Sequence, residues 1–92
     1  MVEAKHVDGT DKGKVLLYAL STCVWCNRTK RLLGDLDVAY DYIDVDTLNF
    51  NDKEAALKEI GKYNPARSFP TLVVGDESIR GFKEDLVRKA LG

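Results

Sequence analysis

The order of strand-type and helix-type segments is the feature that most restricts the fold of this chain. The apolar run KVLLYAL at 14–20 has the length of a strand, and the residues from Cys26 to Leu36 repeat mainly apolar side chains at intervals of three and four. Such spacing is typical of an amphipathic helix. A strand that passes almost directly into a helix predicts a β-α unit at the start of an α/β fold.

The middle of the chain repeats this alternation. The segment VAYDYIDVD at 38–46 begins with the alternation of a strand and is rich in aromatic and β-branched residues. The segment at 51–64 predicts a helix that opens with Asn51 and Glu54 as a capping box and stops before Pro65.

The last third predicts two strands and a helix. The run PTLVV at 70–74 is typical of a buried strand, and the turn GDES leads into a short antiparallel partner, SIR, at 78–80. Residues 82–92 predict a final helix whose apolar positions are Phe82, Leu86 and Ala90.

The predicted order is therefore β-α-β-α-β-β-α. It indicates an α/β domain over residues 14–92, with a central mixed four-stranded sheet flanked by three helices on both faces. Residues 1–13 are polar and dense in turn formers, so they form either a tail or a short edge strand.

Composition narrows the function classes. The chain has 92 residues, which is one domain, and 45% of them are hydrophobic, enough for a small core without crosslinks. The net charge of -1 argues against a nucleic-acid or anionic-membrane partner, and no apolar run is long enough to cross a bilayer. The N-terminus lacks the apolar stretch of a signal peptide, so we expect a cytoplasmic protein.

The two cysteines, Cys23 and Cys26, carry the chemistry of the chain. Cys23 is expected at the first turn of a helix, where unpaired backbone N–H groups and the helix dipole stabilise a thiolate and make it a nucleophile. Cys26 follows one turn later on the same side, where it can resolve a mixed disulfide formed at Cys23. The spacing predicts a redox pair.

Other readings of the pair are weaker. A zinc site requires four ligands, and this chain holds two cysteines and one histidine, so one chain cannot complete it. A structural disulfide across a single helical turn would add only about 2 kcal/mol of stability. Two inert core thiols stay open as an alternative, although the strand-to-helix position argues against them.

A proline at the start of the third core strand is the second landmark. Pro70 follows the aromatic Phe69 and opens TLVV. Together with the cysteine pair at a helix start and the Gly-containing turn before the last helix, it resembles the thioredoxin fold over residues 14–92. More narrowly, the chain is similar to glutaredoxins and to the glutaredoxin-like redoxins that feed ribonucleotide reductase.

This resemblance implies roles for further residues. Pro70 is cis, and the backbone of Phe69 pairs with the substrate. Arg67 and Ser68 lie on the rim of the substrate groove. Trp25 stands at the aromatic position of the motif, off the buried stripe of its helix, and belongs to an exposed apolar patch that docks partners.

The resemblance also bears on the electron donor. Glutaredoxins that use glutathione resemble one another in a lysine three residues before the first cysteine, whereas this chain has Leu20 there. The stretch Gly81-Phe82-Lys83 resembles the redoxins that take electrons from thioredoxin reductase and NADPH. Gly81 and Phe82 are therefore expected at the thiol-binding site, and glutathione or another small thiol remains the alternative donor.

The resulting hypothesis is a monomeric thiol-disulfide oxidoreductase, an electron carrier with no bound cofactor or metal. Its expected partners are disulfide-containing proteins, ribonucleotide reductase among them, and a reductase or low-molecular-weight thiol as donor. The alternative is an iron–sulfur cluster or metal carrier that uses the same two cysteines in a dimer.

Overall fold

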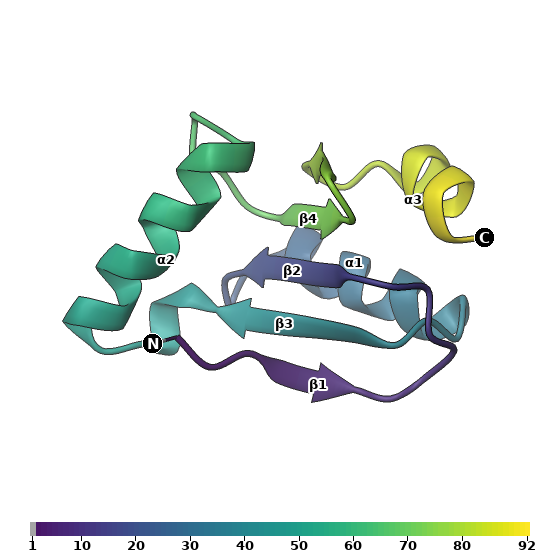
Figure 1. Cartoon of the computed structure of the whole chain (residues 1–92), viewed down its shortest axis with the longest axis horizontal. Coiled ribbons are helices and arrows are strands. Elements are labelled where there is room, and N and C mark those ends of the chain that lie inside the picture. The colour runs from purple at the N-terminus through teal and green to yellow at the C-terminus, as the bar shows by residue number, and fades with distance from the viewer. Residues whose placement is uncertain (1) are drawn as a thin grey trace.

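A computed structural model describes residues 2–92 and shows one mixed sheet with three helices (Figure 1). The sheet order is β1-β3-β2-β4-β5, and only the β2/β3 pair is parallel. The elements are β1 (Lys5–Val7), β2 (Val15–Ala19), α1 (Val24–Asp35), β3 (Tyr40–Asp44), the 3-10 turn η1 (Val45–Thr47), α2 (Phe50–Tyr63), β4 (Thr71–Val74), β5 (Glu77–Arg80) and α3 (Glu84–Leu91). The thioredoxin-like α/β class predicted from the sequence is confirmed.

The sheet has five strands, because the N-terminal segment adds an edge strand to the four predicted for the central sheet; of the two alternatives for this segment, the edge strand is confirmed. Lys5–Val7 pairs antiparallel with β3, with Lys5 opposite Tyr42 and Val7 opposite Tyr40. The short strand is polar and largely exposed. It is therefore held in the sheet by its backbone hydrogen bonds to the free edge of β3 and not by burial of its side chains.

Alternation along β2 divides the core between the two faces of the sheet. Leu17 and Ala19 lie in a cluster with residues of α1 and α3, whereas Tyr18 lies in a second cluster with Ala56 and Ile60 of α2. Successive side chains of a strand point to opposite faces. Consequently α1 and α3 cover one face of the sheet and α2 covers the other. This confirms the prediction of helices on both faces, whereas the sequence did not assign each helix to a face.

Two local predictions about the helices are wrong. The cap of α2 is Asn49, whose side chain accepts a 2.8 Å hydrogen bond from the backbone N–H of Asp52, so the helix starts before the predicted Asn51/Glu54 capping box. In α3 the buried residues are Val87 and Leu91, not the predicted Phe82, Leu86 and Ala90. Because α3 starts only at Glu84, Phe82 precedes the helix, and the apolar stripe shifts by one residue.

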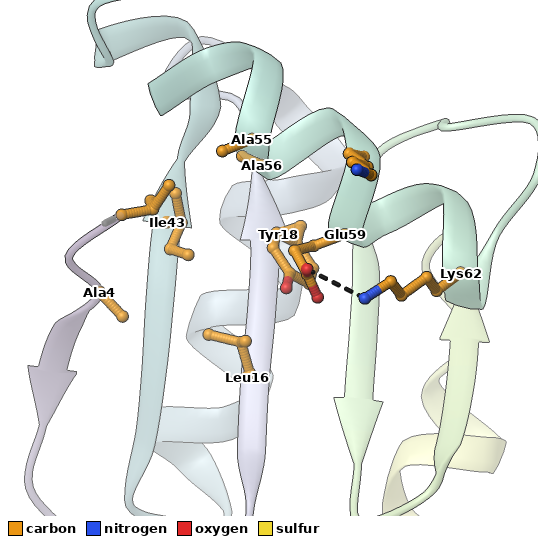
Figure 2. A pocket seen from close by; sticks show the side chains of 10 residues that line it. Ala4, Leu16, Tyr18, Ile43, Ala55, Ala56, Glu59 and Lys62 are labelled. Carbon is orange, nitrogen blue, oxygen red and sulfur yellow. Dashed lines mark hydrogen bonds and ion pairs between the residues drawn. The ribbon is translucent and has the colours of Figure 1, made fainter. Parts of the chain in front are cut away.

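A hollow of about 480 Å³ lies on the α2 side of the sheet (Figure 2). Leu16, Tyr18 and Ile43 form its floor, and α2 supplies one wall, with the Lys62–Glu59 ion pair (3.2 Å) at its edge. Neither cysteine lines it. The hollow is therefore separate from the dithiol, which packs with the α1 face.

Candidate active site

Cys23 is the N-cap residue of α1, as its predicted position at the strand-to-helix junction requires. Its backbone is extended, with φ −82° and ψ 119°, and its Sγ accepts a hydrogen bond from the backbone N–H of Cys26 at 3.2 Å. The thiol thus takes the place of the Ser or Asp oxygen that usually caps a helix. The sulfur of Cys23 therefore lies at the N-terminal end of α1, with a backbone N–H group directed at it.

Cys26 differs sharply from Cys23 although it lies only one turn away. Its side chain is completely buried, in the cluster between the sheet and α1, whereas Cys23 is half-buried. Burial, together with a hydrogen bond to Cys23, raises the pKa of the Cys26 thiol to about 12. A backbone hydrogen bond with Leu20 and, more weakly, the positive charge of Lys30 act in the opposite direction. Both cysteines are free thiols. The pair therefore combines an accessible thiol with one that keeps its proton.

The turn that carries Cys23 is held from two sides. The backbone N–H of Cys23 donates to the carbonyl of Leu20 at 3.1 Å. Asp46 in η1 accepts from both the backbone N–H (2.8 Å) and the hydroxyl (2.5 Å) of Ser21, and these bonds hold the pKa of its carboxyl below the usual range. These contacts fix the strand-to-helix turn and so the position of the first thiol.

Lys30 of α1 forms an ion pair with Asp44 at the end of β3. Its Nζ lies 2.9 Å from Asp44 Oδ1 and 4.4 Å from the ring centroid of Tyr42, and the two charged side chains are only 20% and 14% exposed. Lys30 stands four residues after Cys26 on α1, so the two side chains share a helix face. This cation is the charged group that opposes the high pKa of Cys26.

The Phe69–Pro70 peptide bond is cis, which confirms the expectation drawn from the family resemblance. Phe69 packs against the hydrophobic clusters on both faces of the sheet, and Cys23 packs against the α1-side cluster. Tyr18 pairs with Thr71 in the sheet, so the start of β4, directly after Pro70, lies beside the end of β2 that leads to Cys23. The pairing of the Phe69 backbone with a substrate stays a prediction.

Asn64 holds this loop, and sequence reasoning missed it. The residue is fully buried, and its amide donates to Ser68 Oγ at 2.8 Å and to Thr71 Oγ1 at 3.1 Å. Its Oδ1 accepts from the backbone N–H of Ala66 at 3.2 Å, and Thr71 Oγ1 donates to the carbonyl of Ser68 at 2.8 Å. The one signal in the sequence is the dipeptide Asn64-Pro65, which marks a turn.

Two predicted groove residues have their side chains engaged elsewhere. Arg67 lies in the left-handed region, with φ 52°, and its side chain runs along α2 next to Gly61. The hydroxyl of Ser68 accepts the hydrogen bond from Asn64. Roles of Arg67 and Ser68 in substrate binding stay predictions.

Gly81, Phe82 and Trp25 are the remaining residues predicted at the site, and their role in binding a thiol or a partner stays a prediction. The backbone N–H of Gly81 donates to the carbonyl of Pro70 at 2.8 Å, and its φ of 79° favours glycine there. Phe82 stacks on Trp25 with ring centroids 5.8 Å apart, and the guanidinium of Arg28 lies 5.0 Å from the Trp25 ring. Trp25 is 53% exposed, so the prediction of an exposed aromatic beside the dithiol is confirmed.

Within residues 2–92, no three His, Cys, Asp or Glu side chains gather in a way that would hold a metal ion. Among the helices of that stretch, none has the length and apolar character needed to cross a bilayer.

A cysteine pair at the start of a helix, a buried second thiol and a cis-proline on the neighbouring loop define the class of thioredoxin-fold dithiol proteins. The glutaredoxin family model matches residues 15–79, and the chain belongs to the glutaredoxin family. This confirms the resemblance noted from the sequence. The chain is thus a glutaredoxin-like redox protein with two closely spaced cysteines.

Similar proteins agree with this family. The solved structure of Methanosarcina acetivorans methanoredoxin is 48% identical with a TM-score of 0.89, covering 91% of this chain and 90% of that one. The glutaredoxin from Methanosarcina mazei Go1 is 49% identical with a TM-score of 0.90, covering 97% of this chain and 87% of that one. The glutaredoxin-like protein NrdH of Escherichia coli is 29% identical over 83% of this chain and 86% of its own length.

Other relatives match over a shorter stretch. Glutaredoxin 1 of Rickettsia conorii is 34% identical over 51% of this chain, and the match spans 46% of the length of that protein. The chain therefore spans about half the length of the rickettsial glutaredoxins that it matches.

Proposed function

We propose that this protein is a dithiol electron carrier that reduces disulfides through Cys23 and Cys26. The observation that supports this most directly is the asymmetry of the pair: the Cys23 Sγ accepts the N–H of Cys26 at a helix start, whereas Cys26 is buried with a pKa raised to about 12. Only one thiol is available for the first attack, and the other is protected until that attack has occurred.

The reaction has two exchange steps. The Cys23 thiolate attacks one sulfur of the substrate disulfide, a mixed disulfide forms, and the other substrate sulfur leaves as a thiolate that takes up a proton. Cys26 then loses its proton and attacks the Cys23 sulfur, which forms the Cys23–Cys26 disulfide and releases the second substrate thiol. Two electrons pass from the protein to the substrate, and an external reductant restores the dithiol.

The donor proposed first is thioredoxin reductase with NADPH. Leu20 stands where glutathione-dependent glutaredoxins carry a lysine, and Gly81-Phe82-Lys83 resembles the redoxins that feed ribonucleotide reductase. Similarity to NrdH along most of both chains supports the same choice. On this view ribonucleotide reductase is a candidate substrate, and the carrier works as a monomer in the cytoplasm, where such pairs are kept reduced.

The emission of Trp25, the only tryptophan, tests this function because the residue lies between the two cysteines. The oxidised protein is mixed with thioredoxin reductase and NADPH, with millimolar glutathione, or with dithiothreitol as the control. Recovery of the reduced-state emission with the reductase alone supports the proposed donor. Recovery with glutathione favours a glutathione-dependent carrier instead.

Turnover of 2-hydroxyethyl disulfide, measured with dithiothreitol as reductant, tests the reaction itself. A protein that shows no turnover and no emission change with any reductant would contradict the function. Brown colour and visible absorbance after anaerobic purification would favour the iron–sulfur alternative.

A further inference from the structure

Two arginines on the exposed side of α1 have no role in the dithiol chemistry. Arg28 and Arg31 lie one turn apart and together line two hollows, one of about 450 Å³ between α1 and α3 and one of about 280 Å³ beside Val24. The two side chains are therefore shared by both hollows. We call this pair the arginine ridge.

The guanidinium groups of the ridge are available for a ligand. Among residues 2–92, neither Arg28 nor Arg31 forms an ion pair, although Asp35 and Glu84 also line the larger hollow. Arg88 on the far side of that hollow is already matched by Glu84 at 2.7 Å. The ridge thus presents two unmatched positive charges.

Arg28 is held in place before any ligand arrives. Its guanidinium lies 5.0 Å from the ring centroid of Trp25, which itself stacks on Phe82. A guanidinium over an aromatic face is attracted to it and keeps its N–H groups at the edge of the stack. Ordering in the free protein reduces the entropy lost on binding.

The ridge is continuous with the surface around the first thiol. Val24 and Trp25, which follow Cys23 directly, are 63% and 53% exposed. With a helical rise of about 1.5 Å per residue, Arg28 and Arg31 lie roughly 8 and 12 Å along α1 from Cys23. An extended peptide covers about 3.3 Å per residue, so these distances correspond to about two to four residues.

We propose that the arginine ridge docks an acidic polypeptide segment that lies about two to four residues from the reactive cysteine of a protein partner. Carboxylates match the planar donor groups of Arg28 and Arg31, and the apolar Val24 and Trp25 accept the peptide between the cysteine and its acidic residues. This inference rests on the disulfide reduction proposed above, and it adds the chemistry of the preferred partner.

Three disulfide-bridged peptides of equal length test the ridge. They carry Glu, Gln or Lys at the positions two to four residues on either side of one cysteine. The proteins are the wild type, Arg31→Gln, Arg28→Gln/Arg31→Gln and the charge-matched control Lys53→Gln/Lys58→Gln on α2. The readout is the ratio of kcat/KM for the Glu peptide to that for the Gln peptide, since a ratio within one protein cancels any change in thiol reactivity.

In the wild type and the α2 control we expect the Glu peptide to be favoured by about tenfold at low salt, the combined effect of two exposed ion pairs. The Lys peptide should be the poorest substrate. Arg31→Gln should lower the preference, the double arginine variant should abolish it, and 0.5 M NaCl should suppress it in each protein that shows it.

If the wild type reduced the three peptides with equal kcat/KM, the proposed role of the arginine ridge would be wrong, but the proposed disulfide reduction would stand. An equal loss of preference in the α2 control would lead to the same conclusion. Binding of a Glu peptide without cysteine, followed by Trp25 emission, tests the ridge even in a protein that turns over no disulfide. Equally tight binding of inorganic phosphate or a single-stranded oligonucleotide would overturn the assignment of a peptide ligand.

Discussion

The backbone N–H of Cys26 donates a hydrogen bond to the Sγ of Cys23 at 3.2 Å, so the second cysteine stabilises the first through its main chain. At the same time the side chain of Cys26 is sealed in the core. Within this single helical turn, the backbone and the side chain of Cys26 therefore have separate roles. The residue that supports the nucleophile is the residue that later displaces the substrate from it.

Replacing either cysteine should stop disulfide reduction, but at a different step for each. Cys26→Ser should still attack a disulfide but accumulate the mixed disulfide at Cys23, because no thiol is left to resolve it. Cys23→Ser should form no adduct, because the remaining thiol is buried. Mass spectrometry after addition of a disulfide peptide distinguishes the two, and an adduct on Cys23→Ser would contradict the assignment.

Stability of the reduced protein should fall at high pH because of Cys26. The folded chain keeps this proton until its pKa of about 12, whereas an unfolded thiol releases it near 9.0. Between these values the unfolded state binds fewer protons, so the free energy of unfolding falls as pH rises, by up to about 1.4 kcal/mol per pH unit. Below pH 9 the contribution is fully present.

Urea unfolding under reductant at pH 8, 9 and 10 measures this slope. The Cys26→Ala variant serves as the control, since it keeps the other titrating groups and lacks only this thiol. The wild type should lose stability more steeply than the variant above pH 9. Parallel curves would show that Cys26 does not titrate as described.

Lys30→Gln should both destabilise the fold and slow the second exchange step. It leaves Asp44, which is only 14% exposed, without its partner at 2.9 Å, at a cost of about 1–3 kcal/mol. It also removes the positive charge that opposes the raised pKa of Cys26, so this thiol should lose its proton less readily. Decay of the mixed disulfide, followed by quenched-flow mass spectrometry, should be slower than in the wild type.

Two companion variants make the Lys30 result specific. Lys53→Gln on α2 makes the same charge change and should leave the resolution rate unaltered. Addition of Asp44→Asn to Lys30→Gln should recover part of the stability but not the rate. If the double variant regained the wild-type rate, the effect would come from the fold and not from the charge.

Asn64→Ala should weaken substrate binding more than the chemical step. The substitution removes the amide that bonds Ser68 and Thr71 and so loosens the loop before Pro70, with a stability loss of about 1–3 kcal/mol. Kinetics with a disulfide peptide should show a larger rise in KM than fall in kcat.

Asn49→Ala is the matched control for this loop. It removes the cap of α2, which typically costs about 1 kcal/mol, and touches no residue of the Pro70 loop. It should lower stability without changing KM. An equal rise in KM for both variants would show that general destabilisation, and not loop position, causes the effect.

Local patterns in the sequence predicted most of the architecture and the reactive pair. Strand and helix periodicities placed β2, α1, β3, α2, β4 and β5 with small shifts at their ends. The spacing of Cys23 and Cys26 predicted the hydrogen-bonded turn at the start of α1. Such features depend on interactions within a few residues, so the sequence alone determines them. The cis bond before Pro70 was expected only through family resemblance.

The tertiary structure decided the features for which the local sequence pattern allows more than one outcome. Lys5–Val7 is a strand because an open edge of β3 lies beside it, and α3 buries Val87 and Leu91 because the helix starts only at Glu84. The contact of Trp25 with Phe82 joins two segments that are far apart in the sequence. The hydrogen bonds of Asn64 reach only as far as Thr71, but its complete burial depends on the packing around the loop. The energies of these features come from long-range packing and hydrogen bonding, which no short stretch of the chain encodes by itself.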